Sequence, residues 1–94
     1  MVIGVCTVCL DIPGCHSLKE KRRILKPLLA RLRNDFQVSA AEVNANDLWQ
    51  RAVIGMAIVS NDSGHAHRLL TKVVRSIERS RLDAQVADYR IEIF

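Results

Sequence analysis

The chain has 94 residues, of which 49% are hydrophobic and 26% are charged, and its formal net charge is +4. This length suits one domain, residues 1–94, and the composition is typical of a soluble globular protein. No apolar run approaches the roughly 20 residues that span a bilayer, and Met1 leads directly into a strand-like run without a signal-peptide pattern. With three cysteines, an odd number, we expect free thiols in the cytoplasm and no membrane partner.

The first third of the chain predicts a strand followed by a helix. Val2–Leu10 is apolar at nearly every position and β-branched at several, which predicts a strand buried on both faces. Ser17 and Glu20 have the spacing of a capping box, and leucines at spacings of three, four and seven continue the helix to about Arg33. Pro27 lies inside this helix and removes a hydrogen bond, so we expect a kink or a break there.

The middle of the chain predicts two strands and a second helix. Phe36–Val43 has the composition of a strand, and a turn rich in asparagine separates it from Arg51–Ser60, which is again apolar on both faces. Asp62 or Ser63 can cap a second helix that ends near Arg81 and carries one apolar side.

The last segment, Val86–Phe94, alternates apolar and polar residues and predicts a fourth strand. The order βαββαβ then predicts an α+β, ferredoxin-like two-layer sandwich, with an antiparallel sheet in the order 4-1-3-2 and both helices on one face. This topology makes the first and third strands central, and these are the two strands whose sequences are apolar on both faces. Pattern and topology therefore agree.

Three cysteines and a histidine near the N-terminus raise the question of a zinc site. Cys6, Cys9, Cys15 and His16 are nominally enough ligands for a tetrahedral metal. Residues three apart on a strand point to opposite faces of a sheet, so Cys6 and Cys9 cannot share a metal, and no metal site is predicted. Cys15 and His16 fall in a loop where we expect exposure, and a reactive thiol at Cys15 stays an alternative.

Basic residues are concentrated on the outward sides of the two predicted helices. On a helical projection they lie opposite the apolar stripes, and few acids accompany them. We expect the two outward sides to form one basic layer that binds the phosphates of structured RNA, although an ordinary solvated surface is the alternative. The candidate nucleic-acid-binding residues are Lys19, Arg22, Arg23, Lys26, Arg33, Arg68, Lys72, Arg75 and Arg79.

Polar residues are also expected to gather at one edge of the sheet. The topology brings the start of the first helix close to the turn between the second and third strands, and free backbone donors at a helix start favour an anion. Lys21 falls within the leucine stripe, so it must snorkel or reach toward this edge. Helix capping and turn formation are the alternative roles of the polar residues. The candidate anion site consists of His16, Ser17, Lys21, Asn44 and Asn46.

The face of the sheet that the helices leave uncovered is expected to be aliphatic in its middle, with Asp88, Arg90 and Glu92 along one side. An apolar patch of this kind usually marks an interface. We therefore expect a homodimer that forms through the sheet.

Two blocks of the sequence resemble a known family. These are "SLKEKRRILKPLLARLRNDFQVSAAEV", residues 17–43, and "DLWQRAVIGMAIVSND", residues 47–62. The chain is similar there to the YlxP-like family of small bacterial proteins, a domain of unknown function. The resemblance implies a ferredoxin-like fold, a cytoplasmic protein and, from the genomic setting of the family, an RNA or ribosome partner. It implies no catalytic residue.

The leading functional hypothesis is a non-enzymatic binding module that associates with RNA or the ribosome and needs no cofactor. One alternative is a small phosphate-handling enzyme similar to acylphosphatases in fold and length, although the loop Asp11–His16 lacks the phosphate-binding arginine of that family. Another alternative is a protein-binding adaptor that dimerises through its sheet face.

Overall fold

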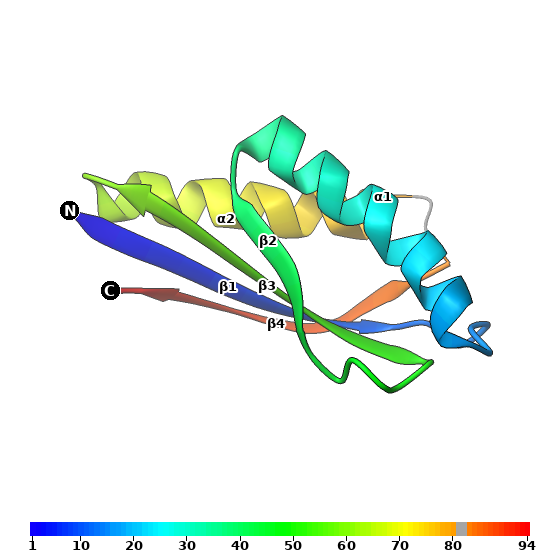
Figure 1. The fold of residues 1–94 in the computed structure, drawn as a ribbon. Helices are drawn as coiled ribbons and strands as arrows, with labels where there is room; N and C mark the ends of the chain where they lie inside the picture. Colours follow the sequence, from blue (N-terminus) through cyan, green and yellow to red (C-terminus); the bar gives the residue numbers. More distant parts are fainter. Residues whose placement is uncertain (81–82) are drawn as a thin grey trace.

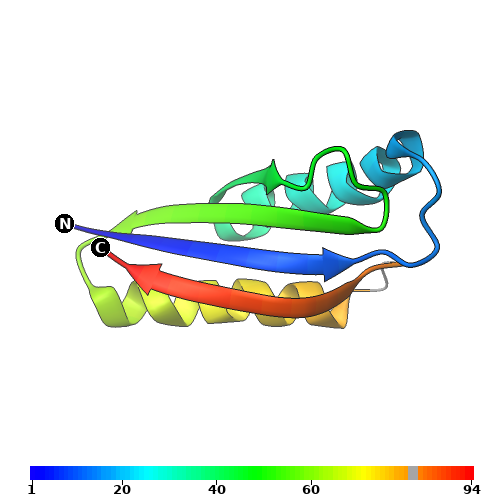
Figure 2. The same ribbon diagram turned by 90° about the horizontal axis from the view of Figure 1, so that it is seen from below.

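The computed structural model describes residues 1–80 and 83–94, which form four strands and two helices in the order βαββαβ. The sheet has the antiparallel order β2-β3-β1-β4, and both helices cover one of its faces (Figures 1 and 2). The predicted ferredoxin-like architecture and the central place of the first and third strands are confirmed. The elements are β1 (Val2–Asp11), α1 (Leu18–Phe36), β2 (Ser39–Asn44), β3 (Arg51–Ser60), α2 (Ser63–Arg79) and β4 (Gln85–Ile93).

The two central strands pair along their whole length, from Val2 opposite Ser60 to Asp11 opposite Arg51. Every second residue of β1 and β3 is buried beneath the helices, whereas most of the alternate residues are only half-buried. The prediction that both faces are buried is therefore wrong for the second face, because no helix or strand among residues 1–80 and 83–94 covers it. We call this second side the open face; its members include Ile3, Val5, Thr7, Cys9, Ala41, Val43, Val53, Gly55, Ala57, Val59, Asp88, Arg90 and Glu92.

Helix α1 is longer than the sequence predicts. It continues through Pro27 without a break and ends at Phe36, so the prediction of a strand beginning at Phe36 is wrong. The physical reason is the next residue, Gln37, which adopts the left-handed conformation (φ 54°) and donates its backbone N–H to the Arg33 carbonyl at 3.0 Å. This is a common way to end a helix, and it delays the second strand to Ser39.

Helix α2 begins where Asp62 accepts a hydrogen bond from the Gly64 N–H at 3.0 Å. It buries Ala66, Leu70, Val73, Val74 and Ile77 against the sheet. The helix approaches β1 closely at Gly4, where a Cβ would lie 3.0 Å from the Leu70 side chain and 3.3 Å from the Ala66 side chain. The predicted end near Arg81 lies outside the described residues.

Strand β4 departs from strict alternation at its first half. Cys9 is opposite Asp88 and Leu10 is opposite Val86, so Ala87 is an extra residue in the ladder with β1. Beyond this bulge Ile91 and Ile93 pack against the core. Neither helix in residues 1–80 and 83–94 is long and apolar enough to cross a membrane.

Candidate nucleic-acid interface

The outer side of α2 carries four exposed cations, Arg68, Lys72, Arg75 and Arg79, at spacings of four, three and four. Residues three and four apart lie on the same side of a helix, so these cations form one row opposite the buried residues. Arg68 has a carboxylate partner, Asp62, at 4.0 Å, but both side chains are largely exposed and such a pair is weak. The other three have no ion pair within the described ranges.

Helix α1 carries its cations on Lys19, Arg22, Arg23, Lys26 and Arg33, which are exposed. None of them forms an ion pair with a described carboxylate. Arg33 is engaged in another way, because its Nε and Nη2 atoms donate to the Ala40 carbonyl of β2 at 3.1 and 2.6 Å. Arg22, Lys26 and Arg33 share a shallow groove with Glu42 of β2. This flank of α1 therefore faces the β2 side of the molecule.

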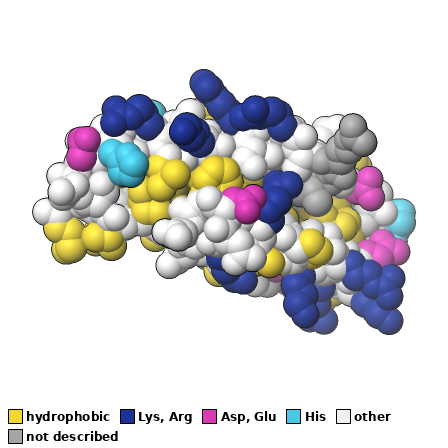
Figure 3. Space-filling model, turned by 90° about the horizontal axis from the view of Figure 1, so that it is seen from above, with side chains coloured by type: hydrophobic (Ala, Val, Ile, Leu, Met, Phe, Trp, Pro, Cys, Tyr) yellow, Lys and Arg dark blue, Asp and Glu magenta, His cyan; other side chains and the backbone are white. Residues whose placement is uncertain are grey.

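The expected single basic layer is instead two groups of cations. Figure 3 looks onto the helical side and shows most Lys and Arg side chains near opposite margins, with hydrophobic and neutral side chains between them. The reason is the rotation of α1 about its axis, which turns its basic flank toward β2 and away from α2. The helical projection could place these cations away from the leucines, but it could not tell which flank faces the other helix.

One cation of α1 does face α2. Arg31 lines a pocket between the helices, which we call the interhelical pocket, together with Phe36, Lys72, Ser76, Arg79 and Ser80. The Nε and Nη2 atoms of Arg31 are buried and have no hydrogen-bond partner among the described residues. Sequence reasoning missed this residue. The available signal was its position three residues after Leu28, at the edge of the leucine stripe.

Lys21 reaches the hairpin between β2 and β3, as its place in the leucine stripe predicted. The side chain is only 2% exposed, and its Nζ atom donates to the carbonyls of Ala45 at 2.8 Å and Leu48 at 2.7 Å. Glu42 completes the set with its Oε2 atom 2.5 Å from Nζ. The ammonium group is thus surrounded by two carbonyls and a carboxylate that offsets its charge, so it is engaged inside the fold and a poor ligand for an external anion.

The other residues of the candidate anion site have local hydrogen bonds. Ser17 accepts from the Glu20 N–H at 3.1 Å, and Glu20 accepts from the His16 N–H at 2.9 Å, so the capping role of Ser17 is present. Asn44 accepts from the Ala45 N–H at 2.8 Å, which shapes the turn. Asn46 is exposed. The structure therefore brings the hairpin to the helix start, but it does so through Lys21.

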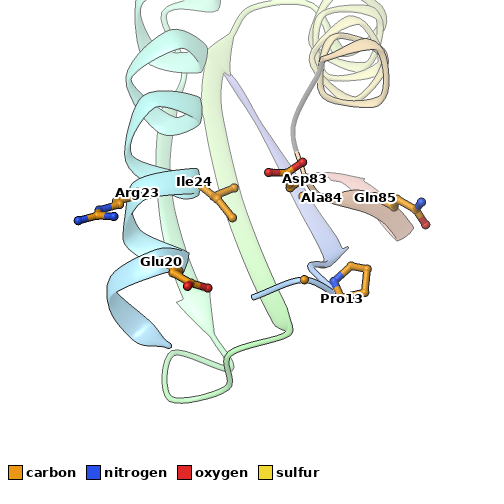
Figure 4. A pocket seen from close by; sticks show the side chains of 8 residues that line it. Pro13, Glu20, Arg23, Ile24, Asp83, Ala84 and Gln85 are labelled. Carbon is orange, nitrogen blue, oxygen red and sulfur yellow. The ribbon is translucent and has the colours of Figure 1, made fainter. Parts of the chain in front are cut away.

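A second pocket lies at the same end of the molecule, between the loop after β1, the start of α1 and the segment before β4. Its lining includes Glu20, Asp83 and Arg23, and in Figure 4 the guanidinium end of Arg23 points away from the two carboxyl groups. Two carboxylates repel a phosphate group. This pocket is therefore a poor site for phosphate, and it offers nothing to the acylphosphatase alternative.

The three cysteines are separated by the fold. Cys6 is buried on the helical side, where burial raises the pKa of its thiol to about 11, and Cys9 lies half-buried on the open face. Cys15 is also buried, with its Sγ atom 3.2 Å from the Ser17 carbonyl, so the expectation of an exposed loop thiol is wrong. Within the described residues no group of His, Cys, Asp and Glu side chains is placed to hold a metal.

Comparisons with known proteins identify relatives and a shared fold. The family described as "Protein of unknown function (DUF503)" matches residues 3–91. The uncharacterized protein YlxP of Bacillus subtilis (strain 168) is 42% identical over 62 residues, which cover 66% of this chain and 67% of that protein.

Among solved structures, the structured domain of Drosophila melanogaster Boca has a TM-score of 0.51 at 19% identity, covering 94% of this chain and 95% of that one. A de novo designed protein with a ferredoxin fold has a TM-score of 0.55 at 10% identity, covering 100% of this chain and 83% of that one. At such low identities these two structures support the fold alone.

Proposed function

The chain belongs to the DUF503 family of proteins of unknown function, and we propose that it is a non-enzymatic module that binds structured RNA, such as ribosomal RNA, through phosphate contacts. The observation that carries this proposal is the row of exposed cations on α2. Three of its four members, Lys72, Arg75 and Arg79, have no carboxylate partner in the described parts of the chain, so their charge is available to an external polyanion.

The spacing of the row suits a nucleic-acid backbone. From Arg68 to Arg79 the helix rises about 16 Å, at about 1.5 Å per residue, and it presents four positive charges over that length. Cations that neutralise phosphates release counterions, which drives association and makes it sensitive to salt. The cations of α1 form a second group near the opposite margin of the helical side, so the two helices can contact separate stretches of one folded RNA.

Gel-shift titration of ribosomal RNA fragments over a series of salt concentrations tests this proposal. Wild-type affinity should fall steeply with salt, and replacing the α2 row with glutamine should lower the slope of log K against log salt by about 3, at about 0.7 to 0.9 for each lost phosphate contact. A matched variant carries four glutamines in the other group, at Lys19, Arg22, Arg23 and Lys26, and should lose less affinity because those cations span a wider arc. Absence of binding at low salt, or an α2 variant that binds like wild type, would refute the proposal.

We also propose that the open face holds a second copy of this chain. Its middle is mostly apolar with Thr7 among small residues, and one end exposes three large apolar side chains, Ile3 (39% exposed), Val59 (69%) and Phe94 (69%). Ile3 and Phe94 exchange backbone hydrogen bonds of 2.9 and 2.8 Å, and Ile3 is opposite Val59, so the three lie together on this face. An exposed patch of this kind is characteristic of an interface.

Size and charge favour a second copy as the occupant. The central strands have ten residues and are about 33 Å long, and four strands are separated by three spacings of about 4.8 Å, so the flat area of the face is about 480 Å². The accessible area is larger because the side chains roughen the surface, so the face can supply much of the ~800 Å² that each partner of a standard interface buries. The β4 margin carries Asp88, Arg90 and Glu92 in alternating sign. Two such rows laid antiparallel and offset by one position place each arginine opposite a carboxylate, whereas the two carboxylates disfavour RNA on this face.

Light scattering on a sizing column tests the dimer. The wild-type mass should be twice 10.6 kDa, and Val59→Lys should give a folded monomer because it places an unpaired charge in the interface. Ala30→Lys is the control, since Ala30 is exposed on α1, on the side of the sheet opposite the open face. A wild-type protein that stays monomeric at millimolar concentration, or a Val59→Lys variant that remains dimeric, would overturn this arrangement. In the first case another protein, or solvent, occupies the face.

A further inference from the structure

The interhelical pocket gathers hydrogen-bond donors that the fold itself does not use. Arg31 contributes two buried donor nitrogens, Nε and Nη2, without an acceptor in the described residues, and Lys72 and Arg79 add their positive charges from α2. The Ser76 hydroxyl lines the same pocket, while the Ser80 hydroxyl already donates to the Ile77 carbonyl at 2.6 Å. Donor groups from α1 and α2 therefore line the same interhelical pocket.

No carboxylate of the described residues lines this pocket to balance its charge. The pocket lining contains no Asp or Glu. The nearest acids in sequence are Asp35, one turn after Arg31, and Glu78, next to Arg79; neither forms an ion pair in the described residues. The three cations that line the interhelical pocket repel one another. In addition, a buried guanidinium donor without an acceptor lowers the stability of the folded state. An anion bound in the pocket relieves both unfavourable terms.

We infer that the interhelical pocket binds one phosphate group, with Arg31 as its central ligand and Lys72, Arg79 and Ser76 around it. A tetrahedral phosphate presents oxygens in several directions, which suits donors arriving from two helices, and the guanidinium fork pairs with two phosphate oxygens at once. Where the phosphate belongs to an RNA backbone, the inference rests on the proposed function. The pocket then adds one phosphate contact beside the α2 row, between the two groups of cations.

Nuclear magnetic resonance of the wild-type protein gives the direct test, because the arginine Nε–H group has its own signal. Titration with inorganic phosphate should shift the Arg31 signal along a saturating curve, and sodium chloride at equal ionic strength should not. A parallel titration with a dinucleotide that contains a single internal phosphodiester distinguishes the two sources of phosphate. Saturation by both probes indicates a backbone site, and saturation by inorganic phosphate alone indicates a small phosphate ligand. A linear shift that chloride reproduces would overturn the inference.

Two single variants separate this inference from the proposed function. Arg31→Met should weaken RNA binding at least 10-fold, whereas Arg22→Met, which removes an exposed cation from the same helix, should weaken it about 2-fold to 3-fold by the loss of one exposed phosphate contact. Equal losses would refute a dedicated site even if RNA binds. If the wild type binds no RNA but Arg31 still saturates with phosphate, the proposed function fails and the phosphate pocket stands.

Discussion

Lys21 and Arg31 are both cations of α1 that lie off its outward basic flank, yet their surroundings are opposite. The Lys21 ammonium has two carbonyls and the Glu42 carboxylate around it. The buried Nε and Nη2 atoms of Arg31 have no acceptor in residues 1–80 and 83–94. A buried cation with a full set of acceptors fastens parts of the fold together. A cation whose buried donors lack acceptors does not stabilise the fold through hydrogen bonds, but it can donate those hydrogen bonds to a ligand.

The largest expected effect comes from removing the better-satisfied cation. Lys21→Met keeps most of the side-chain volume but leaves Glu42 and two carbonyls without their donor, so the free energy of unfolding should fall by about 3 kcal/mol. Urea denaturation measures this change. Lys19→Met is the matched control, because Lys19 is exposed, and should change stability by less than about 0.5 kcal/mol. A loss below about 1 kcal/mol in Lys21→Met would show that Lys21 does not hold the hairpin.

A smaller loss of stability is expected when the charge of Glu42, the ion-pair partner of Lys21, is removed. Glu42→Gln keeps an oxygen acceptor for Lys21 but removes the charge, and we expect a loss of about 1 kcal/mol in the same urea experiment. Glu92→Gln provides the comparison, since the pair of Glu92 with Arg90 at 3.5 Å is largely exposed and should contribute almost nothing. Similar losses in both variants would mean that the buried pair is no stronger than a surface pair.

The smallest effect should have the opposite sign. Arg31→Met removes two buried donors that lack acceptors, so in phosphate-free buffer the variant should equal the wild type or exceed its stability by up to about 1 kcal/mol. Thermal and urea unfolding in a buffer without phosphate or sulfate measures this. A clear destabilisation would contradict the contrast with Lys21, because it would show that Arg31 supports the fold.

The topology could be predicted from the sequence because the local patterns and the global arrangement agree. Two strands that are apolar on both faces had to be central, and two amphipathic helices needed a common sheet. Lys21 stood out for a similar reason, since a cation inside a leucine stripe breaks the helical pattern. In each case the information is local and needs only the period of a helix or strand.

The sequence predictions fail where the conformation or burial of a residue depends on contacts with distant parts of the chain. The end of α1 depends on one backbone conformation at Gln37, which no periodicity encodes. Cys15 is buried because its loop folds onto the core beside Ile12. The interhelical pocket depends on how α1 is rotated relative to α2, so Arg31 could not be separated from an ordinary surface arginine before the helices were placed.

Strand β2 lies at an edge of the sheet, and an uncovered edge can recruit a strand from a neighbouring molecule and so begin a fibril. Arg33 directs two donors at the Ala40 carbonyl of this strand, and Lys21 binds the carbonyl of Ala45 just beyond its end. To form hydrogen bonds with these carbonyls, a strand from another molecule would first have to displace the charged donors of Arg33 and Lys21. Side chains of α1 thus occupy carbonyl groups along the exposed edge of β2. This disfavours edge-to-edge pairing with another chain, and so disfavours aggregation.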